Sequence, residues 1–152
     1  MPGGADLEGA KPDKTISVSL GSSSGTKQHA DLMEMDDESG LALVKVDGNI
    51  DYVSFKISRE EAQLGDPVTV MGYPTGRELT LLLGNVTSLH EPGGRIATSV
   101  AAPAAGLTGS PVLNKRGDVI AVMRGHYEGE LGTSIATPIQ VSSGILTTAL
   151  SE

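Results

Sequence analysis

Short apolar runs, rich in β-branched residues and separated by Gly, Pro, Asn and Asp, recur along most of the chain. Residues 16–20 alternate apolar and polar side chains, and residues 41–46 form a nearly continuous apolar run. Alternation with a period of two predicts a half-buried strand, and short apolar runs between turn residues predict buried strands. Strands spaced about 8–12 residues apart, with turns between them, favour an antiparallel barrel or sandwich. The chain is therefore predicted to be all-β.

Ten strands are predicted in this way: residues 16–20, 30–35, 41–46, 68–71, 79–83, 85–89, 96–100, 111–113, 119–123 and 134–136. Two segments are predicted to be helical instead. Residues 59–63 are expected to form a single helical turn, and residues 138–150 a short helix.

The sequence carries 11 Lys and Arg against 19 Asp and Glu, which gives a formal net charge of −8. Surfaces that bind nucleic acid or anionic membranes need clustered Lys and Arg, so this balance argues against both partners. Cysteine is absent, which excludes a disulfide framework, a thiolate nucleophile and Cys-ligated zinc. A length of 152 residues fits one domain, or two small halves that share a core.

No apolar run approaches the ~20 residues that a membrane-spanning helix needs. Residues 1–12 are Gly- and Pro-rich and acidic, without the basic region and apolar core of a signal peptide. The compartment stays open on this evidence, because many exported proteins also lack cysteine.

Residues 106–112, Gly-Leu-Thr-Gly-Ser-Pro-Val, are the most informative stretch. A turn of the form Gly-x-nucleophile-Gly-Gly/Ser-Pro suits acyl transfer, because its glycines let two amide N–H groups converge on a developing oxyanion. The proline stiffens the exit into the next strand. Such a turn alone is a weak signal, since Gly-rich turns before strands are common.

Further blocks flank this turn in a fixed order. They are Leu-Ala-Leu-Val-Lys-Val-Asp at 41–47, Val-Met-Gly-Tyr-Pro-Thr-Gly at 70–76, Leu-Gly-Asn-Val-Thr-Ser at 83–88, the hairpin sequence at 113–122 and Gly-Thr-Ser-Ile-Ala-Thr-Pro-Ile at 132–139. Together the blocks resemble the trypsin-like serine endopeptidases of the HtrA (Deg) type over residues 15–146. The resemblance implies a trypsin-like double β-barrel with a Ser-His-Asp triad between the barrels.

The same resemblance implies how the chain divides. Residues 1–14 are expected to be a flexible N-terminal segment, and residues 15–60 the late strands of a first barrel truncated at its N-terminus. Residues 61–152 are expected to form a complete second barrel with a C-terminal short helix. If the resemblance holds, the protein is periplasmic or otherwise exported.

The triad positions are missing or altered. The family's catalytic His, in an Ala-His-Val motif, would precede residue 1, and its Asp would stand where the chain has Gly40. The nucleophile position is held by Thr108. By resemblance, the amides of Gly106 and Thr108 form the oxyanion hole. The resemblance also implies that Met123, Arg124 and Gly125 line the substrate pocket or close its rim. An ordinary polar hairpin tip is the alternative interpretation of this segment.

Two functions of different classes follow. The first is a protease homologue without activity that binds peptides or unfolded protein segments, which the altered residues at 40 and 108 favour. The second is an active serine endopeptidase, truncated here or completed by a partner chain. A barrel short of its first strands exposes open edges, so a homo-oligomer or strand-swapped dimer is expected. No cofactor is expected.

A metal-binding role is the weaker alternative. The three histidines, His29, His90 and His126, have no spacing typical of a metal-binding helical pair. Two of them would need acids such as Asp36, Asp37 or Glu128 as co-ligands, and solvated histidines are the preferred interpretation. The acids at 31, 34 and 36–38 lack the spacing of an EF-hand loop, and residues 72–76 lack the Lys-Ser/Thr pair of a phosphate loop.

Overall fold

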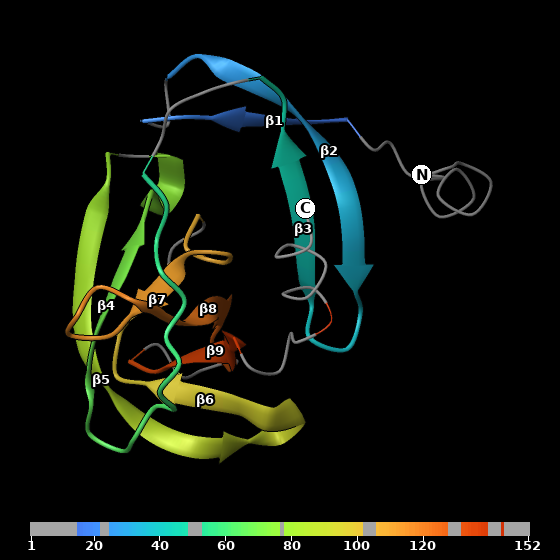
Figure 1. The fold of residues 1–152 in the computed structure, drawn as a ribbon. Helices are drawn as coiled ribbons and strands as arrows, with labels where there is room; N and C mark the ends of the chain where they lie inside the picture. The colour runs from blue at the N-terminus through green and yellow to red at the C-terminus, as the bar shows by residue number, and fades with distance from the viewer. Residues whose placement is uncertain are drawn as a thin grey trace, which may run out of the picture.

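The computed structural model describes residues 15–21, 25–48, 53–76, 78–101, 106–127, 132–139 and Gly144. Across them the predicted all-β fold is confirmed: a three-stranded open sheet lies beside a closed six-stranded barrel (Figure 1). The strands are β1 (Thr15–Ser19), β2 (Lys27–Asp36), β3 (Leu41–Val46), β4 (Pro67–Gly72), β5 (Thr80–Glu91), β6 (Arg95–Thr98), β7 (Pro111–Leu113), β8 (Val119–Gly125) and β9 (Ser134–Pro138). Two short 3₁₀ turns, η1 (Pro74–Gly76) and η2 (Pro92–Gly94), flank β5. No helix among the described residues is long and apolar enough to cross a membrane.

The open sheet has the strand order β1-β2-β3, with antiparallel pairing throughout. Along β2, exposed side chains alternate with covered ones, and Ala30 is fully buried. A bulge between Leu32 and Glu34 shifts the pairing with β3. The sheet therefore has one covered face and one face open to solvent, as expected for period-two alternation.

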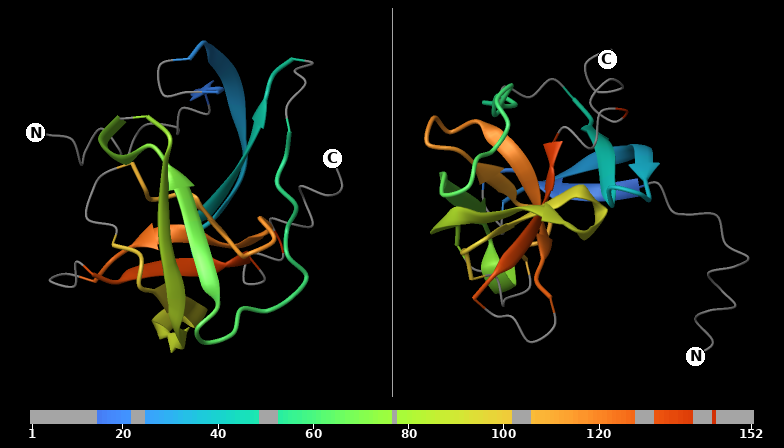
Figure 2. Two further views of the ribbon diagram at one scale, coloured as in Figure 1. Left: turned by 90° about the vertical axis from the view of Figure 1, so that its left-hand side faces the viewer. Right: turned by 90° about the horizontal axis from the view of Figure 1, so that it is seen from below.

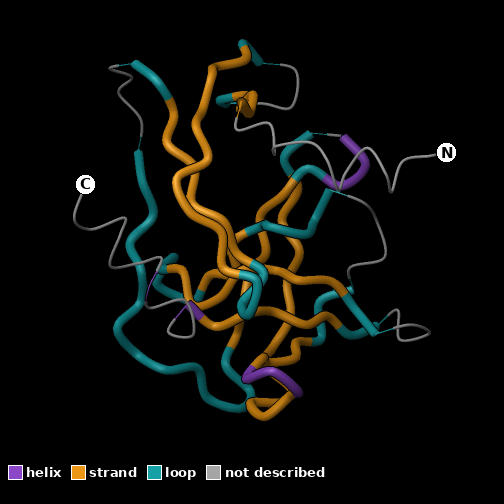
Figure 3. Tube along the Cα trace, turned by 90° about the vertical axis from the view of Figure 1, so that its right-hand side faces the viewer, coloured by secondary structure: helices purple, strands orange, loops and turns teal. Residues whose placement is uncertain are grey.

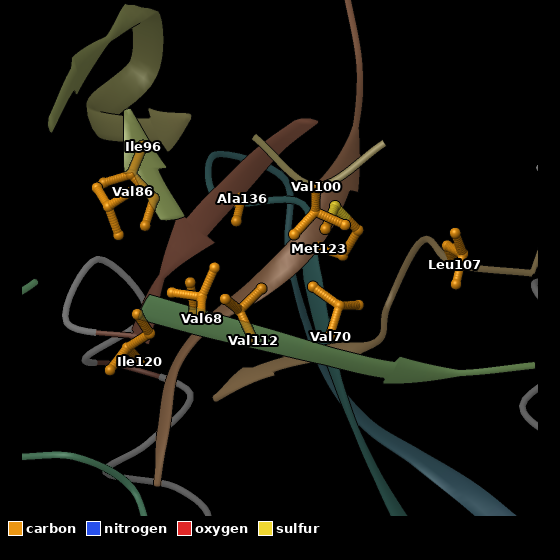
Figure 4. Packing of buried hydrophobic residues seen from close by; sticks show 11 residues of the cluster. Val68, Val70, Val86, Ile96, Val100, Leu107, Val112, Ile120, Met123 and Ala136 are labelled. Carbon is orange, nitrogen blue, oxygen red and sulfur yellow. The ribbon is translucent and has the colours of Figure 1, made fainter. Parts of the chain in front are cut away.

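The barrel closes in the order β4-β5-β6-β9-β8-β7. Closure pairs every barrel strand on both sides and leaves no open edge. Its core consists almost wholly of aliphatic side chains, which suits a sequence with only 3% aromatic residues. Figure 4 shows these residues, with Leu107 at one end on the loop before β7; the cluster is Val68, Val70, Val86, Ile96, Val100, Leu107, Val112, Ile120, Ala121, Met123 and Ala136.

The sheet meets the barrel at the turn between β2 and β3. Ser39 in this turn is buried, and its carbonyl oxygen accepts a hydrogen bond of 3.3 Å from the Thr137 hydroxyl on β9. Two further views show the open sheet standing away from the barrel beyond this turn (Figure 2). The β2–β3 turn, which contains residue 40, is thereby fixed against barrel strands β8 and β9.

The predicted elements and the structure agree closely for most strands but differ at two places. Figure 3 shows strands along most of the described trace and only short helical turns. The helical turn expected at residues 59–63 is wrong, because that segment is irregular. Residues 79–83 and 85–89 were expected as separate strands but belong to the single strand β5. Apart from Gly144, the expected C-terminal helix beyond residue 139 lies outside the described residues.

Candidate functional site

The turn at residues 106–110 leads into barrel strand β7. Leu107 is 2% exposed and belongs to the barrel core, whereas Thr108 beside it is exposed. The amide of Ser110 donates a hydrogen bond of 3.0 Å to the Leu107 carbonyl, which closes the turn. Burial of the leucine side chain thus anchors a turn whose next residue faces solvent.

Gly106 needs to be glycine for two reasons. Its φ of 95° lies in the left-handed region, which costs other residues about 1–2 kcal/mol. A Cβ there would also overlap the Tyr73 carbonyl oxygen and lie 3.1 Å from the Thr75 amide nitrogen. Both groups belong to the backbone and cannot rotate away, so the turn packs closely against the segment after β4.

The turn is also held against β8. The Gly109 amide donates to the Met123 carbonyl, and the Met123 amide donates to the Ser110 carbonyl, each at 2.8 Å. The Thr108 hydroxyl donates to the carbonyl oxygen of Arg124 at 3.4 Å. No described residue accepts a hydrogen bond from the amides of Leu107 or Thr108. The turn therefore presents backbone donors without a partner in the described part of the chain.

Gly40 lies against the side chain of Arg124, although 84 positions separate the two residues. A Cβ at residue 40 would overlap the Arg124 guanidinium group. Gly40 has a φ of 74°, and its amide donates to the Asp36 carbonyl at 2.8 Å. The backbone carbonyl of the same arginine holds the Thr108 hydroxyl. Arg124 thus connects the two positions that the sequence resemblance aligned with the triad Asp and Ser.

The sequence comparison identifies the family to which this arrangement belongs. Residues 6–122 match the family described as a trypsin-like peptidase domain. The chain belongs to the trypsin-like peptidase domain family. A search among curated proteins found no match. The matched residues include the β2–β3 turn, the turn at 106–110 and the start of β8, so the elements just described are those of this family domain.

The three residues expected at the substrate pocket differ in what they present. The Met123 side chain is 1% exposed and packs in the barrel core, so only its backbone is near the turn. The Arg124 side chain is exposed, and no described acid forms an ion pair with it. Gly125 ends β8 opposite Ile135. Of these three, Arg124 alone offers a side chain to a ligand.

His29 has partners that the sequence analysis did not anticipate. Its Nδ1 contacts an Asp47 carboxylate oxygen, and its Nε2 lies 3.6 Å from Asp31 Oδ1. The hydrogen bond to Asp47 raises the pKa of His29, and the negative charges of Asp47 and Asp31 add to this effect. The expected co-ligands Asp36 and Asp37 are not part of this cluster.

Asp36 instead stabilises the β2–β3 turn. Its Oδ1 accepts a hydrogen bond of 3.2 Å from the Glu38 amide. The hydrogen bond from Ser39 is the largest cause that lowers the pKa of the Asp36 carboxyl. The acids between residues 31 and 38 therefore do not act as one group, because Asp31 belongs to the His29 cluster and Asp36 to the turn.

A concave region lies between residues 55–60 and the β7–β8 hairpin, and no residue of the 106–110 turn lines it. Its volume is about 800 Å³. Lys56, Arg59 and Arg116 line it together with Glu60 and Asp118, and Arg116 pairs with Glu60 at 3.7 Å. No motif in the sequence pointed to this cavity, because it forms where residues 56–58 pair with Val119.

Proposed function

We propose that this domain is a proteolytically inactive relative of the HtrA-type serine endopeptidases that binds peptides or unfolded protein segments. The contact between Gly40 and Arg124 carries the proposal. A triad needs a carboxylate that orients the catalytic imidazole and stabilises the imidazolium that forms. Residue 40 has no side chain, and a guanidinium group lies against it. A positive charge at this place opposes an imidazolium rather than stabilising it.

The surroundings of Thr108 support the same conclusion. A hydroxyl nucleophile needs a general base within hydrogen-bond reach. The described partner of the Thr108 hydroxyl is the carbonyl of Arg124, and a backbone carbonyl does not take up a proton at neutral pH. The threonine methyl group further restricts rotation about χ1. Both features disfavour attack on a peptide bond.

The turn retains what binding requires. The amides of Leu107 and Thr108 have no described acceptor. The Thr108 hydroxyl donates to the backbone carbonyl of Arg124, whose exposed guanidinium lies against Gly40. Backbone donors that point at one acceptor can hold a peptide carbonyl or carboxylate oxygen. The close packing of Gly106 on Tyr73 keeps these donors in place without a ligand. The expected ligand is therefore an extended peptide, with a preference for acidic groups near Arg124.

Two assays on the purified chain test this proposal. A fluorophosphonate probe should leave the protein unlabelled, and fluorescently labelled, unfolded casein should bind saturably without cleavage. Arg124→Ala should weaken casein binding several-fold. Arg116→Ala is the matched control, since Arg116 is also exposed but lies on the β7–β8 hairpin, and it should leave binding unchanged.

Stoichiometric labelling of Thr108 or Ser110 would favour the second candidate, an active endopeptidase completed by a partner chain. Equal loss of binding in both arginine variants would place the binding surface elsewhere. The metal-binding alternative rests on a different observation, the His29 cluster.

A further inference from the structure

We propose that His29, Asp31 and Asp47 form a binding site for a divalent transition-metal ion such as zinc, on the open face of the three-stranded sheet. In this site His29, through Nε2, and Asp31 are the ligands, and Asp47 holds the imidazole in position. The metal-binding atoms of the three residues lie within 4.8 Å of one another. They belong to strand β2 and to the residue that follows β3.

The strand register builds the cluster. Ala30 pairs with Val46 across β2 and β3, so His29 and Asp47 are opposite one another at the next position. The Asp47 amide donates to the His29 carbonyl at 2.9 Å, which extends the ladder to this pair. Asp31 lies two residues further along β2 and therefore on the same face. Backbone hydrogen bonds thus place all three residues on one face of the sheet before any ion binds.

The two carboxylates approach different nitrogens of one imidazole. The Asp47 carboxylate contacts Nδ1, while Asp31 Oδ1 lies 3.6 Å from Nε2. A metal ion binds a single ring nitrogen, and the N–H on the other side of a metal-bound imidazole usually donates to a carboxylate. Asp47 already contacts Nδ1 at hydrogen-bond distance, which leaves no room for an ion there, whereas an ion can bridge the 3.6 Å between Nε2 and Asp31 Oδ1. The arrangement therefore assigns Asp31 to the metal and Asp47 to the ring N–H.

The donor set selects the class of ion. One imidazole nitrogen and one carboxylate suit zinc, copper and nickel, whereas calcium and magnesium prefer all-oxygen sites. The side chains of the cluster are 44–57% exposed, so water can occupy the remaining coordination positions. Lys45 stands opposite Asp31 in the β2–β3 register, and Lys27 lies two residues before His29 on the same face of β2. These cations reduce the negative potential at the cluster and set an upper limit on affinity.

Titration of the full chain with zinc chloride tests the proposal. We expect one saturable site by calorimetry, and in NMR spectra the ring signals of His29 should change while those of His90 and His126 stay in place. His29→Gln and Asp31→Asn should each weaken binding at least tenfold. His90→Gln is the matched control, because His90 is also exposed, on β5, and this variant should bind zinc like the original chain.

The role of Asp47 has its own readout. Loss of such an outer carboxylate typically costs about 10–100-fold in metal affinity, so Asp47→Asn should weaken binding about tenfold and Asp47→Glu should restore most of it. Circular dichroism checks that each variant keeps its fold. Undiminished zinc binding in His29→Gln, no saturable binding by the original chain, or calcium binding that equals that of zinc would each overturn the proposal.

Discussion

Restoring the two altered triad residues should produce a folded protein without protease activity. The perturbation is the pair Gly40→Asp and Thr108→Ser in one chain. It returns a carboxylate and an unhindered hydroxyl to the positions that the family resemblance assigns to them. The structure gives the cost of each change separately.

The cost at residue 40 has two parts. The φ of 74° costs a residue with a side chain about 1–2 kcal/mol, and aspartate lies at the low end of that range. The new Cβ would overlap the Arg124 guanidinium, but this group is the far end of an exposed side chain and can rotate away. The relocated Arg124 can pair with the new carboxylate, which returns at most about 1 kcal/mol at an exposed site. The net loss of stability is therefore at most about 1 kcal/mol.

The change at residue 108 adds little, because exposed substitutions usually stay within about 0.5 kcal/mol. A loss of about 1 kcal/mol in a domain of this size lowers the midpoint of thermal unfolding by roughly 2–4 °C. Thermal unfolding followed by circular dichroism measures this shift. Gly40→Ala is the control, since it carries the same backbone cost without gaining an ion pair and should lower the midpoint at least as much.

Activity should stay at the level of buffer in a casein cleavage assay. Triad residues act as a unit, and removing the base alone costs about as much as removing every member. The new serine would still lack a described imidazole as its partner. Casein cleavage by the double variant, absent when Thr108→Ala replaces Thr108→Ser beside Gly40→Asp, would refute this reasoning. Removing His29 or His126 from the active variant would then identify the base.

Four further outcomes are expected. Gly106→Ala should destabilise the fold by more than about 2 kcal/mol in urea unfolding, since backbone overlap adds to the left-handed φ; a smaller loss would contradict the close packing of the turn. Asn114→Ala should cost about 1 kcal/mol, because its side-chain oxygen accepts two amide hydrogen bonds in the β7–β8 hairpin, and an unchanged midpoint would show that water replaces them. The folded-state pKa of His29, measured by NMR, should lie above its ordinary value of about 6.5 and should fall in Asp47→Asn. The contribution of protonated His29 to the free energy of unfolding should be fully present below that ordinary value and should disappear as pH rises through the folded-state pKa. Sedimentation should show a fraction of dimer that rises with protein concentration, because β1 and β3 each have an unpaired edge in the described sheet. A monomer at every concentration would exclude edge pairing.

The sequence predicted best where local signals and tertiary structure agree. The strand β3 has the expected bounds, because Asp-Gly-Asn ends an apolar run that also fits the open sheet. Gly84 misled the prediction for β5, because a glycine inside an apolar run also indicates a turn. In the structure it lies inside the strand, where a Cβ would stand only 2.8 Å from the Val100 side chain. The close approach of Val100 explains why residue 84 is glycine, and a single sequence does not display such a contact.

The helical turn expected at residues 59–63 failed for a different reason. Side chains there bind the backbone in ways that compete with a helix. The Ser58 hydroxyl accepts a hydrogen bond from the Glu60 amide, and an Asp66 carboxylate oxygen accepts one from the Gln63 amide. The partners in each hydrogen bond lie two or three residues apart, so the residues that form them are visible in the sequence. The same residues are also compatible with a helical turn, which made the prediction ambiguous.

The site was predictable only as far as it is local. The turn at residues 106–110 follows from its glycines and proline, and in the structure it exposes Gly106, Thr108 and Gly109 while Leu107 and Ser110 are buried. The contact of Gly40 with Arg124 and the cluster around His29 depend on how the sheet meets the barrel and on strand register. Such long-range pairs leave no spacing pattern in a single sequence.

Chemical-shift mapping of a bound peptide tests the proposed function most directly. The isotope-labelled chain is titrated with an extended acidic peptide, and the peptide is recovered afterwards to check its length by mass spectrometry. A peptide-binding domain without protease activity requires that the amides of Leu107 and Thr108 shift most, together with Arg124, and that the peptide is recovered intact. Shifts confined to other surfaces, or recovery of a cleaved peptide, would contradict it.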